Sequence, residues 1–213
     1  MSSIELFQNK TDCCGCSACY NVCPRKAISM QEDEYGYVYP VIDQDKCVGC
    51  GLCRKVCHYQ ADKELRTPIK AYAAAGKKEE FLKKAASGGM FSLVADKILE
   101  EGGVVFGAAM EYQNNTLIPK HIAVESKEEL FKLQGSKYVQ SFIGDTYTDA
   151  KKYLADCRKV LFSGTPCQIE GLKGYLGREY ENLYTIDIIC HGVPNAKWFQ
   201  DYIKVFETKL QGS

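Results

Sequence analysis

The chain has 213 residues, of which 46% are hydrophobic and 25% charged, the composition of an ordinary globular protein with one large or two small domains. Lysine plus arginine and aspartate plus glutamate both number 27, so no net charge favours a nucleic-acid partner. The longest apolar runs fall far short of the roughly 20 residues that span a bilayer. Residues 1–10 lack the features of a secretion signal. We therefore expect a cytoplasmic protein without a membrane span.

Twelve cysteines stand out, nine of them between positions 13 and 57. Crowded thiols without an export signal favour metal binding over disulfides. Two segments at an offset of 34 residues both follow the spacing C-x2-C-x2-C-x3-C, which is typical of bacterial ferredoxins with two 4Fe–4S clusters. Pro24 follows the first run, as that motif expects, whereas His58 takes the same place after the second.

In such a repeat, three cysteines surround one cluster and the fourth reaches the other. We therefore assign Cys13, Cys16, Cys19 and Cys57 to cluster one, and Cys47, Cys50, Cys53 and Cys23 to cluster two. The alternative is zinc, but zinc sites use paired C-x2-C units with a longer gap between them. Cys14 aligns with the apolar Val48, so we interpret it as a small buried thiol and not as a ligand.

The elements expected in the N-terminal part form a ferredoxin-like α+β domain. Short β-type runs at 27–30 and 37–41, with turn residues between them, predict a hairpin between the two cysteine runs. The polar segment 61–70 is typical of a linker. We therefore predict a ferredoxin-type domain over residues 1–66 and a second domain over residues 67–213.

The second domain alternates strand and helix patterns, which predicts an α/β fold with a mixed or parallel sheet. The expected strands are residues 69–75, 104–110, 117–124, 160–163 and 183–189. The expected helices are residues 88–101, 126–133, 145–156, 167–176 and 195–210, the second of them with Ser126 and Glu129 as a capping box.

Two strand-to-helix turns, at 164–168 and 190–194, lie where open α/β sheets bind ligands. Cys167 would lie at a helix N-terminus, which favours a thiolate. Amides at 87–89 could hold a phosphate, and the loop 134–140 adds polar donors and a cation. The plainer interpretations are a simple helix start, buried thiols at Cys167 and Cys190, and a turn residue at His191. We expect no role for Cys157 and a solvent-facing side chain at His121.

Taken together, the tandem cysteine motif and four later segments resemble the coenzyme F-420 (deazaflavin) hydrogenase/dehydrogenase beta-subunit family. The segments are AASGGMFS at 85–92, GSKYVQS at 135–141, FSGTPCQIEGLK at 162–173 and DIICHGVP at 187–194. The resemblance implies an iron–sulfur flavoprotein that binds FAD. It implies a flavin pocket formed by Ser87, Gly88, Gly89, Ser136, Lys137, Tyr138, Thr165 and Gln168, with Cys167, Cys190 and His191 as catalytic candidates. Family members usually continue well past residue 210, so we expect the family's C-terminal part to be absent.

Clusters carry single electrons and a flavin exchanges pairs, which is the reason to combine them. We expect an oxidoreductase that passes electrons between a redox partner protein, either ferredoxin-type or another subunit, and FAD through two 4Fe–4S clusters. The FAD would then serve a deazaflavin or another organic substrate. The alternative is a non-enzymatic electron-transfer subunit that uses only the clusters. A third interpretation makes Cys167 and Cys190 a redox-active dithiol or ligands of an extra cluster.

Overall fold

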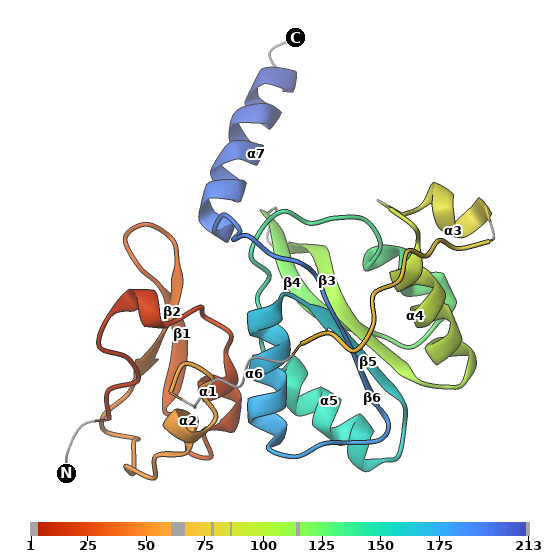
Figure 1. Ribbon diagram of the computed structural model, residues 1–213. Helices are drawn as coiled ribbons and strands as arrows, with labels where there is room; N and C mark the ends of the chain where they lie inside the picture. Colours follow the sequence, from red (N-terminus) through yellow and green to blue (C-terminus); the bar gives the residue numbers. More distant parts are fainter. Residues whose placement is uncertain (1–3, 61–66, 78, 86, 114–115, 212–213) are drawn as a thin grey trace.

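The computed structural model describes residues 4–60, 67–77, 79–85, 87–113 and 116–211. It places a small cysteine-rich unit against one face of a larger α/β unit, with α7 projecting away from both (Figure 1). Most of the predicted linker, residues 61–66, lies outside the described residues, so the domain boundary at residue 66 stays a prediction.

The cysteine-rich unit has the predicted hairpin. Its helices are η1 (Lys10–Asp12), α1 (Ala18–Val22) and α2 (Leu52–Lys55), and its strands are β1 (Ile28–Glu32) and β2 (Val38–Ile42). The strands pair antiparallel, with Ile28 opposite Ile42. The turn between them is held by Asp33, whose carboxylate accepts the N–H groups of Tyr35 at 3.1 Å and Tyr37 at 2.9 Å. Local turn chemistry therefore fixes the hairpin register.

The internal repeat is also present in the backbone. Gly15 and Ser17 of the first cysteine loop have φ angles of +66° and +64°, and Gly49 and Gly51 of the second have +69° and +74°. Ser17 and Gly51 directly precede α1 and α2 at equivalent positions. Both loops thus share one left-handed conformation, which glycine adopts freely and serine only with strain.

Ser17→Gly is therefore expected to stabilise the cluster-loaded protein by about 0.5–1 kcal/mol, because relief of left-handed strain exceeds the entropy that glycine adds to the unfolded chain. Anaerobic thermal unfolding measures the effect. The matched variant Gly51→Ser imposes the same strain on the second loop and should lower the melting temperature. A lower melting temperature for Ser17→Gly would show that the serine hydroxyl contributes more than the strain costs.

The larger unit contains the predicted mixed sheet, with strand order β4-β3-β5-β6. The strands are β3 (Val104–Gln113), β4 (Thr116–Val124), β5 (Val160–Gly164) and β6 (Leu183–Asp187). β3 pairs antiparallel with β4 and parallel with β5, and β5 pairs parallel with β6. The carboxyl ends of β5 and β6 therefore meet at one edge, where both predicted ligand-binding turns begin.

Helices cover both faces of the sheet. α4 (Met90–Glu100) and η2 (Lys127–Lys132) lie on one face, and α5 (Thr146–Ala155) and α6 (Pro166–Leu176) lie on the other. The unit also contains α3 (Glu79–Lys83) and α7 (Ala196–Gln211). Phe106 and Phe162 pack in one core with α5 and α6, while Val105 and Leu161 pack in a second core with α4 and η2. Successive strand residues point to opposite faces of the sheet, so the sheet forms the middle layer between two layers of helices.

Three sequence-based expectations about elements were wrong. Residues 67–77 form no strand, and Ile69 and Tyr72 are 98% and 80% exposed, because no described strand pairs with this segment to support its β-type residues. The helix expected at 126–133 is present as the 3-10 helix after Ser126, which occupies its N-cap position, but Ser126 makes no side-chain cap bond, so the capping box was wrong. The last strand ends at Asp187, which leaves Ile189 exposed.

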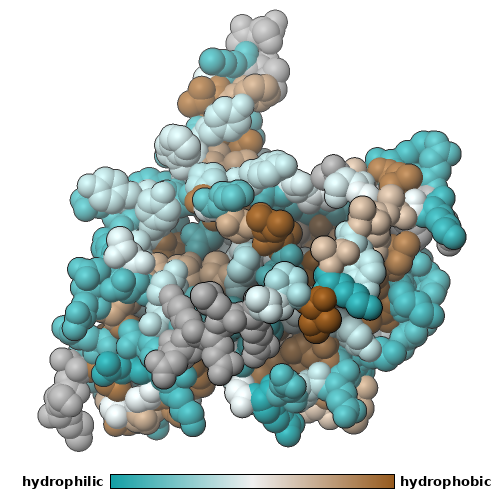
Figure 2. Space-filling model, in the orientation of Figure 1, coloured by the Kyte–Doolittle hydropathy of each residue, from teal (hydrophilic) through white to brown (hydrophobic). Residues whose placement is uncertain are grey.

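Helix α7 presents an apolar stripe to solvent. Trp198, Tyr202, Val205 and Phe206 are all more than half exposed, and they recur at helical spacing along a helix that stands away from the body (Figures 1 and 2). None of the described helices is both long and apolar enough to cross a bilayer.

Candidate functional site

The four cysteines assigned to cluster two line a single small cavity. Cys23, Cys47, Cys50 and Cys53 share it with apolar side chains, including Ile28 and Ile42. Cys23 comes from the first cysteine run and the other three from the second, as the crossed assignment requires. Four thiols around one apolar cavity fit a 4Fe–4S cluster, which needs sulfur ligands and protection from water.

The four cysteines assigned to cluster one also lie close together. Burial, together with repulsion from the neighbouring Cys16 and Cys57, raises the pKa of the Cys13 thiol to about 11. Burial likewise raises the pKa of Cys19, with added repulsion from Cys16 and Cys13. Crowded buried thiols cannot ionise together without a positive charge among them, and a bound metal centre supplies that charge. The donor set therefore fits a second cluster.

Helix α6 docks the cysteine-rich unit against the sheet. A Cβ added at Gly171 would lie 3.0 Å from Cys16 Sγ, and one at Gly174 would lie 2.4 Å from the Val56 carbonyl oxygen. Ala18 and Val56 join the core that α5 and α6 form with the sheet. Gly171 thus lets α6 approach residues 13–19, the cluster-one loop, and Gly174 lets it approach the backbone next to Cys57, without an intervening side chain.

Polar contacts reinforce this junction. Asn21 Nδ2 donates to the Gly144 carbonyl at 2.9 Å, and Gln140 Nε2 donates to the Cys14 carbonyl at 3.1 Å. The loop 140–144 therefore holds the backbone of Cys14, which directly follows the assigned cluster ligand Cys13.

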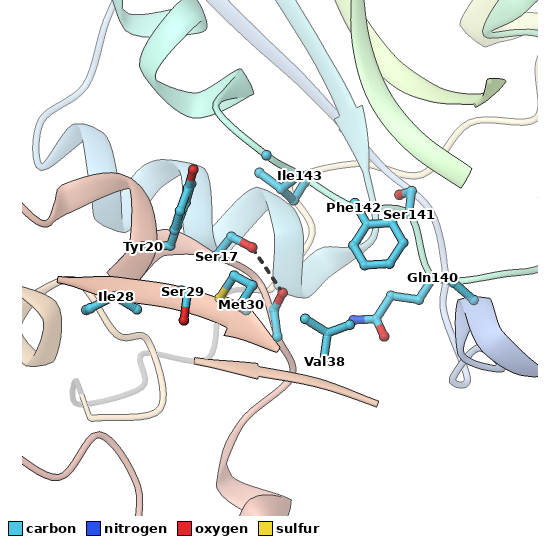
Figure 3. Close-up of a pocket in the computed structure, with 13 residues that line it drawn as sticks. Ser17, Tyr20, Ile28, Ser29, Met30, Val38, Gln140, Ser141, Phe142 and Ile143 are labelled. Atoms are coloured by element: carbon cyan, nitrogen blue, oxygen red, sulfur yellow. Dashed lines mark hydrogen bonds between the residues drawn. The ribbon is translucent and has the colours of Figure 1, made fainter. Parts of the chain in front are cut away.

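A cavity of about 280 Å³ opens beside this loop (Figure 3). Ser17, Tyr20 and Met30 line it from the cysteine-rich unit, and residues 140–144 line it from the α/β unit. None of the residues predicted to bind flavin lines this cavity.

Cys14 lies at the junction. Its sulfur is 3.9 Å from His58 Nε2, and the ligand atoms of Cys14, Cys16 and His58 lie within 4.8 Å of one another. Hydrogen bonds to Cys16 and Cys167 raise the pKa of Cys14, and the bond from Cys14 lowers the pKa of Cys167 to about 6.

A chain of buried hydrogen bonds anchors the start of α6. Gln168 Nε2 donates to Ser141 Oγ at 3.1 Å, while Gln168 Oε1 accepts the Thr165 N–H at 3.0 Å. Ser141 Oγ lies 2.9 Å from His121 Nδ1, and His121 Nε2 lies 2.9 Å from the Ser163 carbonyl. Since a carbonyl only accepts, Nε2 carries the proton and Nδ1 accepts from Ser141. This network aligns the turn that carries Cys167.

The expectation that His121 faces solvent was wrong. Its side chain is 2% exposed and stacks on Phe162 with ring centroids 5.4 Å apart. Burial lowers its pKa to about 4. A strand pattern gives alternation but not which face a polar residue takes, and the partners Ser141 and Ser163 lie far along the chain.

His121 therefore predicts a pH dependence of stability. Its pKa is depressed in the folded state, so its contribution is fully present above the unfolded value of 6.5 and is lost as the pH falls toward 4. Between pH 7 and pH 5 the free energy of unfolding should drop by about 2 kcal/mol from this group. Denaturant unfolding at the two pH values measures the drop. The variant His121→Gln should flatten it, and an unchanged slope would contradict the assignment.

The residues predicted to bind flavin lie in two groups. Gly88 and Gly89 begin α4, and Gln134 Nε2 reaches Ser92 Oγ at 3.0 Å, which brings the loop before Ser136 to this helix. The Lys137 ammonium donates to the Lys132 and Gln134 carbonyls at 3.0 and 2.7 Å, and burial lowers its pKa to about 8. The exposed members of this group are Ser87, Ser136 and Tyr138.

The second group lies at the carboxyl ends of β5 and β6. It comprises Thr165, Cys167 and Gln168, and then Cys190 and His191 after β6. Gln168 is 5% exposed, and both polar atoms of its side chain are used within the protein. Cys190 accepts the Gly192 N–H at 3.4 Å, and His191 is exposed. The flavin-binding and catalytic roles of both groups stay predictions.

Sequence reasoning missed the Cys14–His58 contact and the His121–Ser141 pair. A signal for the first was present in the repeat. Cys14 adds a thiol to the first run where the second run has Val48, and His58 follows the second run where Pro24 follows the first. No comparable signal marks the second pair.

The fold and the paired cysteine sets define an iron–sulfur electron-transfer protein. Residues 12–61 match the model of the 4Fe-4S dicluster domain. Residues 71–144 match the N-terminal model of the coenzyme F420 hydrogenase/dehydrogenase beta subunit, and residues 157–212 match its C-terminal model. Together these matches cover most of the chain, which therefore belongs to the coenzyme F420 hydrogenase/dehydrogenase beta-subunit family. Because residues 157–212 match the C-terminal model, at least part of the family's C-terminal region is present in this chain, contrary to the expectation that it is absent.

Curated relatives show the same combination. The chain is 24% identical over 193 residues to the coenzyme F420-dependent sulfite reductase of Methanocaldococcus jannaschii, a match that covers 85% of this chain and 28% of that protein. An uncharacterized ferredoxin from the same organism is 33% identical over 55 residues, which are 26% of this chain and 70% of the ferredoxin. An uncharacterized protein is 25% identical over 80% of this chain and 54% of its own length. The chain thus spans only part of its longer relatives.

Among solved structures, a chain of the F420-reducing [NiFe] hydrogenase complex from Methanosarcina barkeri is similar to this one. The TM-score is 0.49 at 22% sequence identity, and the match covers 66% of this chain and 52% of the hydrogenase chain.

Proposed function

We propose that the chain is an iron–sulfur flavoprotein oxidoreductase unit that moves electrons between a redox partner protein and FAD. A ferredoxin-type protein or another subunit would be the partner, and a deazaflavin or another organic compound would be the substrate. The observation that carries the proposal is the docking of the cluster-one loop on α6, which begins at the edge of the sheet where the ligand-binding turns are predicted.

The two cysteine sets would hold the clusters, and each cluster would supply one-electron transfer. The residues at the start of α4 fit the phosphates of FAD, because Ser87 is exposed and the first amides of this helix lack intrahelical partners. Tyr138 is 82% exposed and free to cover a ring. The buried Gln168 would act by holding the Cys167 turn in place.

The second candidate function is a non-enzymatic electron-transfer subunit. Among the described residues, none of those predicted to bind flavin lines the cavity beside cluster one, and this observation favours the second candidate. In that case the α/β unit would only dock a partner.

Anaerobic reconstitution with iron, sulfide and FAD distinguishes the two. The flavoprotein proposal expects about eight iron atoms and one FAD per chain, with FAD-dependent reduction of a dye by reduced deazaflavin or a nicotinamide. Full iron content with no bound FAD would favour the electron-transfer subunit. Zinc in place of iron and sulfide would refute both.

A further inference from the structure

The two cysteine loops share one backbone conformation but have different surroundings. A Cβ added at Gly15 of the first loop would lie 2.6 Å from the Val38 carbonyl oxygen, whereas one added at the equivalent Gly49 has no described atom within 4 Å. Ser17 is 6% exposed, and a Cβ added at its counterpart Gly51 likewise meets no described atom within 4 Å. The first loop is therefore packed inside the protein, while the second lies at the surface.

Side chains of the second loop also reach solvent. Cys50 is exposed, whereas its counterpart Cys16 is half-buried. Val48 and Leu52 line the cluster-two cavity and are 57% and 38% exposed. Because an electron tunnels efficiently over short distances alone, a redox centre that exchanges electrons with another protein has to lie near the surface. Of the two cluster sites, cluster two meets this requirement.

Basic side chains surround the cluster-two ligands. Five basic residues lie within three positions of such a ligand, and all five are exposed: Arg25, Lys26, Lys46, Arg54 and Lys55. Asp45 is the one acidic residue within the same distance. Lys46 pairs with Asp43 at 2.7 Å, and the other four basic residues form no ion pair within the part of the chain that the structure describes. A local positive charge thus accompanies the exposed site, although the chain as a whole is neutral.

The charged and apolar groups meet at the cavity itself. Arg25 lines the cluster-two cavity together with Val48 and Leu52. Lys55 follows Leu52 by three residues on α2, so these two side chains lie on the same side of the helix. The surface therefore has an apolar centre and a charged rim, which is the composition of interfaces between proteins.

We propose that this cluster-two face, which consists of Val48, Leu52 and the five basic residues around them, is the docking surface for an acidic electron-carrier protein. Negative charge around the redox centre of the carrier would be attracted by the basic rim and would guide the two centres together. Each encounter would oxidise the carrier by one electron and reduce cluster two by one electron, with no bond formed or broken. The electron-transfer part rests on the proposed function, whereas charge-dependent docking does not.

Binding of an acidic two-cluster ferredoxin to the anaerobically reconstituted full chain tests the surface. The association rate constant, measured by surface plasmon resonance, should fall at least about tenfold when salt is raised from about 0.02 to about 0.5 M. At low salt, the double variant Arg25→Glu, Lys55→Glu should associate about tenfold more slowly than the unchanged protein. The matched variant Lys151→Glu, Lys152→Glu makes the same charge change at exposed positions of α5 and should associate at the unchanged rate.

Iron analysis accompanies each variant, because Arg25 and Lys55 lie close to cluster ligands in the sequence. If the charge-reversed variant holds less than about eight iron atoms, the milder Arg25→Gln, Lys55→Gln at full iron content decides, and it should associate about threefold more slowly. Equal rates for the unchanged protein and a fully loaded variant would overturn the proposal. Tighter binding of a basic cytochrome c than of the ferredoxin would also overturn it.

Duplex DNA serves as a second anion and should bind at least about tenfold more weakly than the ferredoxin, because it cannot match the apolar centre. Equal binding would show a general polyanion surface and would refute the acidic carrier. Charge-dependent ferredoxin binding by a chain that takes up no FAD would leave the docking surface standing while the proposed function fails. FAD-dependent dye reduction without ferredoxin binding would mean the reverse.

Discussion

Replacing Cys57 with alanine is expected to remove one cluster, so that iron falls from about eight to about four atoms per chain. Cys57 follows α2 in the second cysteine run, yet it lies with Cys13, Cys16 and Cys19. Loss of this cluster should therefore make Cys13, Cys16 and Cys19 of the first run reactive toward an alkylating reagent, while the cysteines that remain in the second run stay protected. Iron and sulfide analysis gives the number of clusters, and alkylation mapping shows which cysteines became free.

The reciprocal variant sharpens the test. Cys23→Ala should lose the same amount of iron but free Cys47, Cys50 and Cys53, which share its cavity. Cys157→Ser is the matched control, since Cys157 is exposed and outside both sets, and it should keep all the iron. If each variant instead freed the other cysteines of the run in which the substitution lies, each run would bind its own cluster, and the crossed assignment would be wrong.

Replacing Gly174 with leucine is expected to destabilise the protein by about 3 kcal/mol, the upper end of the cost of overpacking. A Cβ at this position would already lie 2.4 Å from the Val56 carbonyl oxygen, which belongs to backbone and cannot rotate away. Val56 directly precedes the ligand Cys57, so the displacement should also reach cluster one. Denaturant unfolding, followed by both cluster absorbance and circular dichroism, measures the loss.

The control for this variant is Lys173→Leu on the same helix. Lys173 is exposed, and among the described residues its ammonium pairs with Glu170 at the surface, so the change should stay within about 0.5 kcal/mol. Equal stability of the two variants would mean that the units do not pack through α6.

Much of this fold could be predicted from the sequence because the signals are local. The cysteine spacing, the turn before Tyr37 and the apolar period of 160–163 each determine structure within a few residues, and the hairpin and the buried strand were confirmed. The strand expected at 69–75 failed because a strand depends on a neighbour that local sequence does not encode.

The site was less predictable for the same reason. The sequence predicts that Cys167 and Cys190 follow two strands at one edge of the sheet, and it gives no signal that Cys14, more than 150 residues earlier in the chain, also affects the Cys167 thiol. Only the docking of the two units brings these segments together, and docking depends on the small residues Gly171 and Gly174 on α6.

Those two glycines also bear on how far an electron must tunnel. Helix α6 runs from the carboxyl end of β5 along the cluster-one loop, and no side chain at Gly171 separates it from Cys16. Tunnelling probability falls steeply with separation, so in the proposed function the small residues Gly171 and Gly174 would favour fast electron transfer between that edge of the sheet and cluster one.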